Sequence, residues 1–321
     1  MVWVTSANLN TARNFLAGGG NSSNAICMGG YNGSAESLTE KFNGSSWSTT
    51  GNLNTSRRAL AGGGNSSDAI CMGGDTGSSN SGVSEKFNGS SWSTTDSLNT
   101  ARYGLAGGGN SSDAICMGGW TGIMSAVTEK FNGNTWSTTG NLNTARRWLA
   151  GGGNTSDAIC MGGHDGTNSA VTELFNGNTW STTGNLNTAR YALTGGGNTS
   201  DAICMGGYTS YAVATTEKFN GSSWSTTDGL NTARYYFTGG GNTSDAICMG
   251  GYTTTYSAVT ERFNGSSWST TDDLNTARQA LAGGGNTSDA ICMGGSTTTY
   301  SAVTELWSEG IARYFSFVNT M

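Results

Sequence analysis

Arginine, cysteine and glutamate recur along the 321-residue chain at one fixed spacing, and each of these residue types can carry chemistry. Neighbouring copies in each series are 44 residues apart, with a single step of 45, as between Arg57 and Arg102. A thiolate is a nucleophile or metal ligand, guanidinium groups bind anions, and carboxyl groups transfer protons. The three series are Arg13, Arg57, Arg102, Arg146, Arg190, Arg234 and Arg278; Cys27, Cys71, Cys116, Cys160, Cys204, Cys248 and Cys292; and Glu40, Glu85, Glu129, Glu173, Glu217, Glu261 and Glu305.

The recurring arginines and glutamates are interpreted as structural ion pairs. One residue of each type occurs per repeat, and pairing within or between repeats satisfies two charges that are costly to bury alone. A ring of arginines that binds an anion near a common axis is the alternative interpretation. The residues expected in structural pairs are Arg57, Glu85, Arg102, Glu129, Arg146, Glu173, Arg190, Glu217, Arg234 and Glu261.

Nothing in the sequence predicts a catalytic or metal site. His164 is the single histidine, and one histidine cannot build a multi-histidine metal site. A recurring aspartate such as Asp157 suggests calcium, but that ion needs about six or more oxygen ligands, so we interpret this residue as a turn cap. The remaining acidic residues form no pair suited to glycoside hydrolysis. We therefore expect no catalytic residue, no metal and no cofactor, and a protein that is not an enzyme.

The overall composition excludes several classes of protein. The 52 glycines, absence of proline and 35% hydrophobic content are by themselves typical of disorder, but the regular order of the repeat argues against it. With 15 basic and 21 acidic residues, the chain lacks the basic excess of a nucleic-acid-binding protein. Its apolar runs are too short for a membrane span, and its first residues lack the basic and apolar segments of a signal peptide.

The repeat length and the turn residues predict an all-β fold. Periods of about 40 to 50 residues indicate propeller blades or pairs of helices, and frequent Gly, Asn, Ser and Thr leave no stretch long enough for two helices. Glycine pairs and Asn-Gly turns divide each unit into short segments. In one unit the expected strands are 189–197, 202–207, 214–219 and 222–227. We therefore predict a closed seven-bladed β-propeller with four antiparallel strands per blade.

The two ends of the chain predict how the ring closes. Trp3 lies ten residues before Arg13, as Trp47 lies ten before Arg57, so residues 1–13 form the end of a unit. The last unit lacks that end, and the N-terminal strand is expected to supply the outer strand of the last blade, which removes an exposed edge. The propeller is thus expected to span 1–308. Residues 309–321 form an apolar tail, expected either to cover a blade or to mediate self-association.

The units resemble the kelch repeat. The glycine pair after the second strand, an aromatic residue such as Phe219, and Trp224 five residues later carry the resemblance, which covers about 1–308. Kelch repeats form propellers, so the resemblance implies the same fold. These units are shorter than the kelch length of about 50 residues, and they have Asn-Gly where kelch repeats often have an acidic residue and a proline. The near-identity of the units also resembles recently amplified propellers of bacterial, phage and metagenomic origin.

Variation between the units is concentrated in two places: the two residues after each arginine, and the stretch after each glycine pair. Antiparallel strands put both places on one face of the ring and the constant turns on the other. Tyr, Trp and Arg, which dominate recognition surfaces, are frequent there. The candidate binding residues are Tyr31, Asp75, Trp120, His164, Tyr208, Tyr252, Arg58, Tyr103, Arg147, Trp148, Tyr191, Tyr235 and Tyr236.

These residues predict a non-enzymatic recognition propeller that binds a glycan, as a lectin does, or a protein through its variable face. Neutral drift in loops is the simpler explanation of the variation, but it does not favour aromatic residues or one face. The alternative function is a structural or assembly component, for example of a phage or another particle, without a small ligand. No nucleic-acid partner and no membrane span are expected.

The seven cysteines are predicted to be free, buried packing residues. Equivalent residues in neighbouring blades lie farther apart than the Cα limit of about 7 Å for a disulfide, and no second cysteine occurs within a blade. Free thiols of this kind favour synthesis and folding in a reducing cytoplasm.

Overall fold

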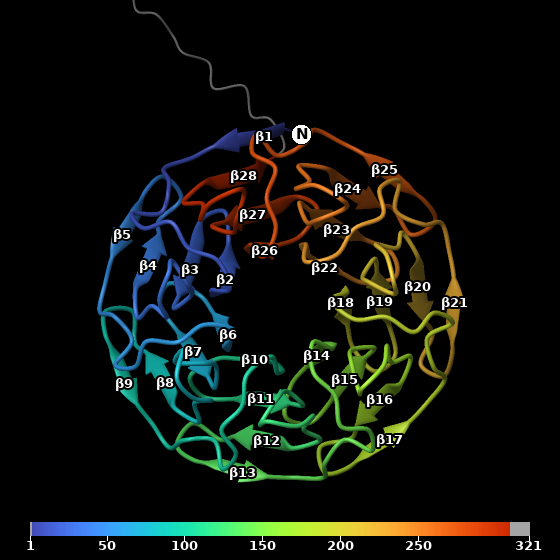
Figure 1. Cartoon of the computed structure of the whole chain (residues 1–321), viewed down its shortest axis with the longest axis horizontal. Helices are drawn as coiled ribbons and strands as arrows, with labels where there is room; N and C mark the ends of the chain where they lie inside the picture. The colour runs from blue at the N-terminus through green and yellow to red at the C-terminus, as the bar shows by residue number, and fades with distance from the viewer. Residues whose placement is uncertain (1, 309–321) are drawn as a thin grey trace, which may run out of the picture.

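The computed structural model describes residues 2–308 as a ring of seven four-stranded antiparallel sheets around a central channel (Figure 1). Strands are the regular elements of this described part, and none of its residues forms a helix long and apolar enough to cross a membrane. The predicted seven-bladed β-propeller is confirmed. The predicted role of the tail 309–321 concerns residues outside the described part.

The blades follow one another along the chain, and each contributes its first strand to the channel (Figure 1). Blades 1 to 3 contain β2 (Ala17–Asn21), β3 (Asn24–Met28), β4 (Thr39–Phe42) and β5 (Trp47–Thr49); β6 (Ala61–Gly64), β7 (Ala69–Met72), β8 (Ser84–Phe87) and β9 (Trp92–Thr94); and β10 (Ala106–Gly109), β11 (Ala114–Met117), β12 (Thr128–Phe131) and β13 (Trp136–Thr138). Blades 4 to 6 contain β14 (Ala150–Gly153), β15 (Ala158–Met161), β16 (Thr172–Phe175) and β17 (Trp180–Thr182); β18 (Thr194–Gly197), β19 (Ala202–Met205), β20 (Thr216–Phe219) and β21 (Trp224–Thr226); and β22 (Thr238–Gly241), β23 (Ala246–Met249), β24 (Thr260–Phe263) and β25 (Trp268–Thr270). Blade 7 contains β26 (Ala282–Gly285), β27 (Asp289–Met293), β28 (Thr304–Ser308) and β1 (Val2–Thr5).

Blade 7 joins the two ends of the chain, as predicted. Strand β1 pairs antiparallel with β28, from Val2 opposite Ser308 to Thr5 opposite Glu305. The ring centroids of Trp3 and Trp307 lie 5.4 Å apart, where blade 5 has the pair Phe219 and Trp224 at 5.1 Å. The closing strand therefore brings its own core side chain as well as backbone hydrogen bonds.

Glycine in the innermost strands is required by their close approach. A Cβ added to Gly63 would lie 2.6 Å from the carbonyl oxygen of Gly109 in the next blade, and one added to Gly284 would lie 2.2 Å from that of Gly20. Real Cβ atoms do not come so close to an oxygen. Side chains at Gly63 and Gly284 would force the blades apart, which explains the glycine at these two positions of the inner strands.

The innermost strands are shorter than predicted. Strand β18 begins at Thr194, whereas the sequence pattern predicts a strand from residue 189. Ala192 interrupts it because its φ is 50°, in the left-handed region and outside the extended conformation of a regular strand. Tyr191, on the other side of this break, forms a separate bridge with Tyr208.

The polar turns between the first and second strands differ in detail from the prediction. Asn65 caps its own turn, because its Oδ1 accepts hydrogen bonds from the backbone amides of Ser67 at 2.9 Å and Asp68 at 3.2 Å. Asp68, interpreted from the sequence as the cap, instead accepts a hydrogen bond from the Ser111 amide of the next blade at 3.0 Å. Asp68 therefore connects neighbouring blades, whereas Oδ1 of the equivalent Asp157 is buried without a hydrogen-bond partner.

The hydrophobic core lies between the blades, because each second strand sends alternate side chains to its two neighbours. Ile70 and Met72 of blade 2 pack with Cys116, Phe131 and Trp136 of blade 3. The same combination recurs around the ring. All seven cysteines are free and buried, as predicted.

A recurring hydrogen bond inside this core joins neighbouring blades and is absent at one position. In blade 2, Trp92 Nε1 donates to Thr39 Oγ1 of blade 1 at 2.9 Å, and five other tryptophans do the same at 2.8 to 2.9 Å. Trp136 faces a serine, Ser84, in place of the threonine, and both Trp136 Nε1 and Ser84 Oγ are buried without a partner.

We expect Ser84→Thr to raise the free energy of unfolding by about 1–2 kcal/mol, because it restores a hydrogen bond to two buried polar groups and adds a buried methyl group. The methyl group fits at the six equivalent positions, where the threonine is buried. Urea unfolding of the two proteins measures the change, and Thr172→Ser is the matched reverse variant. An unchanged or lower stability of Ser84→Thr would contradict the prediction.

Candidate recognition site

The structure brings each predicted arginine and glutamate together within a blade. The guanidinium and carboxylate groups are separated by 2.5 to 3.2 Å, and both side chains are buried. The pairs are Arg13–Glu40, Arg57–Glu85, Arg102–Glu129, Arg146–Glu173, Arg190–Glu217, Arg234–Glu261 and Arg278–Glu305. Because these arginines are buried and paired, they form no open ring that could take an anion.

An asparagine that the sequence interpretation missed completes each pair. Asn143 donates to Glu173 Oε2 from its backbone amide at 2.6 Å and from its side chain at 2.8 Å, while Thr144 donates to Oε1 at 3.3 Å. The lead-in to each blade thus wraps around the glutamate. The available signal was that NT(A/S)R, with its asparagine, recurs in every unit.

The thiols lie beside these ion pairs but are not activated by them. Arg102 Nη2 lies 3.1 Å from Cys116 Sγ. Burial nevertheless raises the pKa of the Cys116 thiol to about 12, although the charge of Arg102 opposes this. The described part of the chain also contains no group of three or more His, Cys, Asp or Glu side chains that could hold a metal ion.

In every blade, the residue after the arginine forms a backbone bridge with the residue after the glycine pair. Arg58 and Asp75, for example, exchange backbone hydrogen bonds of 2.9 and 2.8 Å, which continue the pairing of the first two strands beyond their break. Every blade therefore presents one hydrogen-bonded pair of variable residues on the same face. The pairs are Asn14–Tyr31, Arg58–Asp75, Tyr103–Trp120, Arg147–His164, Tyr191–Tyr208, Tyr235–Tyr252 and Gln279–Ser296.

A third variable residue joins each pair and was missed in the sequence. It bridges back to the residue that follows the glycine pair, as Tyr256 does to Tyr252. The third residues are Ala35, Asn80, Met124, Asn168, Ala212, Tyr256 and Tyr300. Their variation among the units was the signal that could have identified them.

Aromatic side chains form a continuous series across blades 3 to 6, here called the aromatic arc. Its rings contact one another at centroid distances of 5.8 Å (Trp148–Tyr191), 5.4 Å (Tyr191–Tyr208), 4.9 Å (Tyr208–Tyr235) and 5.6 Å (Tyr235–Tyr252). The Arg147 guanidinium connects it to blade 3, since it lies 4.3 Å from the Trp120 ring and 4.0 Å from the Trp148 ring. The arc comprises Trp120, Trp148, His164, Tyr191, Tyr208, Tyr235, Tyr236, Tyr252 and Tyr256.

Burial changes the acidity of part of the arc. The pKa values of Tyr191, Tyr235 and Tyr236 are raised, chiefly because their phenol groups are partly removed from water and secondly because other tyrosines lie nearby. These hydroxyl groups therefore remain neutral hydrogen-bond donors at physiological pH.

A smaller cluster lies on the opposite side of the same face, over blades 7, 1 and 2. The Arg58 guanidinium lies 4.5 Å from the Tyr31 ring and forms a salt bridge of 3.1 Å with Asp75. Tyr300 contacts Tyr31 edge to face at 5.7 Å. Tyr103 lies between the two groups, paired with Trp120 through its backbone.

The second residue after each arginine forms an inner ring at the mouth of the central channel. Its φ lies between 49° and 51° at six positions and is 61° at Gly104. A left-handed conformation costs a residue other than glycine about 1–2 kcal/mol, and here hydrogen bonds between blades maintain it, such as Ala59 N to Phe15 O at 3.0 Å. The inner ring comprises Phe15, Ala59, Gly104, Trp148, Ala192, Tyr236 and Ala280.

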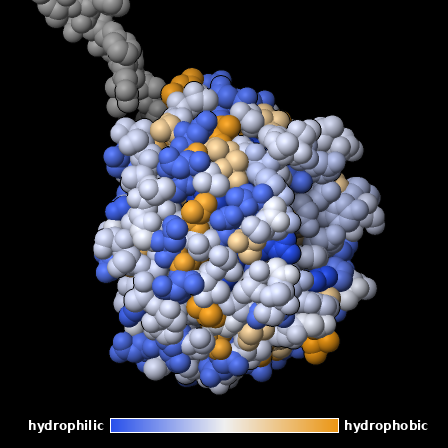
Figure 2. Space-filling model, turned by 60° about the vertical axis from the view of Figure 1, so that its left-hand side comes forward, coloured by the Kyte–Doolittle hydropathy of each residue, from blue (hydrophilic) through white to orange (hydrophobic). Residues whose placement is uncertain are grey.

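The rim of the propeller has a different character. Figure 2 shows mostly hydrophilic and neutral residues on one side of the molecule, with hydrophobic residues in small separate spots. By contrast, two of the large hydrophobic side chains that are exposed in the described residues lie on the variable face: Phe15 in the inner ring and Tyr300 in the smaller cluster.

The fold and this face define a seven-bladed β-propeller whose constant blades carry one variable face. A scan against models of protein families and a search of curated proteins found no match to the chain.

Proposed function

We propose that the protein is a non-catalytic recognition module that binds a glycan or a protein through the aromatic arc. The observation that carries this proposal is that the variable residues of different blades contact one another in an unbroken series, from Trp120 to Tyr256. Independent drift in separate loops would not be expected to join aromatic rings across four blades.

The composition of the face supports this proposal. Tyr and Trp supply large contact areas at low cost in conformational entropy, and Ser, Thr, Gly and Asn supply adaptable hydrogen bonds. The loops that carry the arc combine both kinds, as in the segment from Tyr252 to Ser257, YTTTYS. We also propose that the units descend from kelch-like repeats, and that the protein folds in a reducing compartment, where buried thiols remain free.

The repeat itself supplies matched substitutions for testing the arc. We expect the triple variant Trp120→Ser, Trp148→Ala and Tyr235→Gln to fold as the wild type does, because Ser296, Ala192 and Gln279 occupy the same positions in other blades. Binding to a printed glycan array and to a displayed peptide library is expected to fall at least tenfold, since central aromatic residues dominate such interfaces.

The matched control changes the opposite face: Ser22→Thr, Ser66→Thr and Ser111→Thr introduce the threonine that the last four units have in that turn. This variant is expected to bind as the wild type does. Retention of binding by the arc variant would refute the proposal. A wild type that binds neither array nor library would favour the structural or assembly role instead.

A further inference from the structure

We propose that the mouth of the central channel, inside the inner ring, is a binding site for an uncharged aromatic ring. This site goes beyond the proposed recognition of a glycan or protein: it shares Trp148 and Tyr236 with the aromatic arc, but these two residues and Phe15 together line the opening of the channel.

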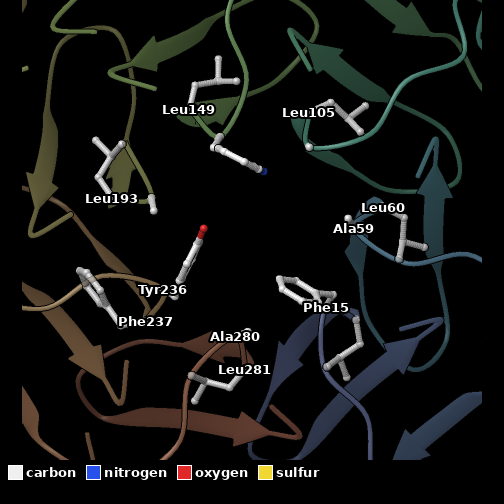
Figure 3. A pocket seen from close by; sticks show the side chains of 14 residues that line it. Phe15, Ala59, Leu60, Leu105, Leu149, Leu193, Tyr236, Phe237, Ala280 and Leu281 are labelled. Carbon is white, nitrogen blue, oxygen red and sulfur yellow. The ribbon is translucent and has the colours of Figure 1, made fainter. Parts of the chain in front are cut away.

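The opening is a defined cavity. Its volume is about 380 Å³, and the inner ring and the residues next to it line it. Figure 3 shows Phe15 and Tyr236 pointing into the opening, whereas Leu105, Leu149 and Leu193 point away from it, into the spaces between blades. The side chains that enter the cavity are thus those of the variable inner ring.

The sizes of the inner-ring residues indicate a ligand more than a structural role. Phe15, Trp148 and Tyr236 occupy a left-handed conformation in which glycine is the least strained residue, yet glycine occurs at only one of the seven positions. Phe15 is 46% exposed, so its ring adds little to the folded core. Trp148 and Tyr236 are half-buried, and large aromatic side chains in a strained position at the edge of an open cavity are best explained by contact with something in the cavity.

Trp148 is held in place by its neighbours. A Cβ added to Gly104 would lie 3.2 Å from Trp148 Nε1, so the absence of a side chain at Gly104 leaves room for the indole. Tyr191 stacks on the same indole at 5.8 Å, and Arg147 lies over it at 4.0 Å. The aromatic wall of the cavity is therefore preorganised.

The chemistry of the lining favours a neutral ligand. No charged side chain lines the cavity, and backbone amides of the inner ring already donate to neighbouring blades, as Trp148 N does to Gly104 O at 3.1 Å. An anion would lose its hydration without gaining a partner among the lining side chains, and a cation would find the Trp148 ring already in contact with the Arg147 guanidinium at 4.0 Å. An aromatic ring, by contrast, can pack edge to face or offset against Phe15 and Tyr236.

The volume sets the size of the ligand. A cavity of about 150 Å³ holds benzene, so the opening has room for a compound of about two fused rings. Indole is therefore a suitable probe, and N-acetyltryptophanamide presents the same ring attached to a peptide backbone.

The test measures dissociation constants by ligand-observed nuclear magnetic resonance. Phe15→Ala and Tyr236→Ala are expected to fold, because Ala59, Ala192 and Ala280 have the same φ, and each should raise the dissociation constant for indole at least fivefold. Ala59→Phe, which copies blade 1 into blade 2, should narrow the cavity and also weaken binding at least fivefold. Tyr252→Ser changes a residue of the aromatic arc that lies outside the inner ring, so it should leave the dissociation constant for indole unchanged.

Charged analogues complete the test. Indole-3-acetate and tryptamine are expected to bind at least tenfold more weakly than indole. Tighter binding of indole than of N-acetyltryptophanamide would support a free compound as the ligand, and the reverse would support a side chain of a protein partner. No saturable binding of either neutral probe, equal effects of Tyr252→Ser and Phe15→Ala, or equal binding of the charged analogues would overturn the proposal, whatever the outcome for the aromatic arc.

Discussion

Between pH 9 and 10, the free energy of unfolding is expected to fall by up to about 9 kcal/mol per pH unit. Burial raises the pKa of Cys71 and Cys204 to about 11 and that of Cys27 and Cys116 to about 12, from 9.0 in the unfolded chain. Well below pH 9 both states hold these protons. Above it the unfolded thiols ionise and the buried thiols do not, so rising pH favours the unfolded state.

The size of the effect follows from the number of thiols. Each proton that the unfolded state lacks contributes about 1.4 kcal/mol per pH unit, and the seven free cysteines act together. Because protein domains are stable by only about 5–15 kcal/mol, the propeller is expected to unfold near pH 10. The loss is complete only when pH passes the raised pKa values of about 11 to 12.

Urea unfolding in the presence of a reductant, repeated in small steps from pH 8 to 10, measures this slope. The window ends at pH 10 because ordinary tyrosines, with a pKa of about 10, are half ionised there. Cys116→Ala and Cys204→Ala shift the stability through lost packing, but each should also reduce the slope by about 1.4 kcal/mol per pH unit. A slope that does not depend on the number of cysteines would contradict the explanation.

Removing one partner of a buried ion pair is expected to have the second-largest effect. We expect Glu173→Gln to lower the free energy of unfolding by about 3–5 kcal/mol, because it leaves Arg146 charged and buried without its counterion. The two side chains lie 3.0 Å apart and neither is exposed. The glutamine preserves the shape and one acceptor, so the loss reports mainly the charge.

A partly exposed ion pair in the same protein serves as a control for the effect of burial on the loss of stability. Arg58 and Asp75 form a pair of the same charges at 3.1 Å, but the arginine side chain is 32% exposed and the acid 20%. Asp75→Asn should therefore cost less than about 1 kcal/mol. Urea unfolding compares the two variants, and the double variant Arg146→Met with Glu173→Gln should cost less than the sum of its single changes. Equal losses in the buried and exposed pairs would show that burial does not control the effect.

Much of the fold could be predicted from the sequence because the same pattern of turn and strand residues occurs in seven units. The period and the turn residues predict the blades, and the distance from Trp3 to Arg13, matched by Trp47 and Arg57, predicts how β1 closes the ring. The pairing of arginine with glutamate follows from residue types that require a partner when buried.

The details that could not be predicted depend on neighbouring blades. The left-handed residue at Ala192 carries no glycine or asparagine signal, because hydrogen bonds around the inner ring impose its conformation. Asn65 and Asp68 are both good turn residues, and only the position of Ser111 in the next blade determines that the aspartate bonds outward.

As with the fold, only part of the candidate site could be predicted from the sequence. Antiparallel strands place the two variable positions on one face. Their one-to-one pairing continues the pairing of the first two strands of each blade, whereas the ring contact from Tyr208 to Tyr235 joins blades 5 and 6, and a single repeat does not encode such a contact.

The pairing of β1 with β28 has a consequence for the order in which the protein folds as it is made. Each of the first six blades contains four strands that leave the ribosome one after another, so each of these sheets can pair its own strands before blade 7 is synthesised. Strand β1 is synthesised before the other described strands but pairs only with β28, the last of them, so Trp3 contacts Trp307 only after β28 has been made. A nascent chain therefore carries β1 unpaired while the strands between it and β28 are made, and the pairing that closes the ring is the last to form among the described strands.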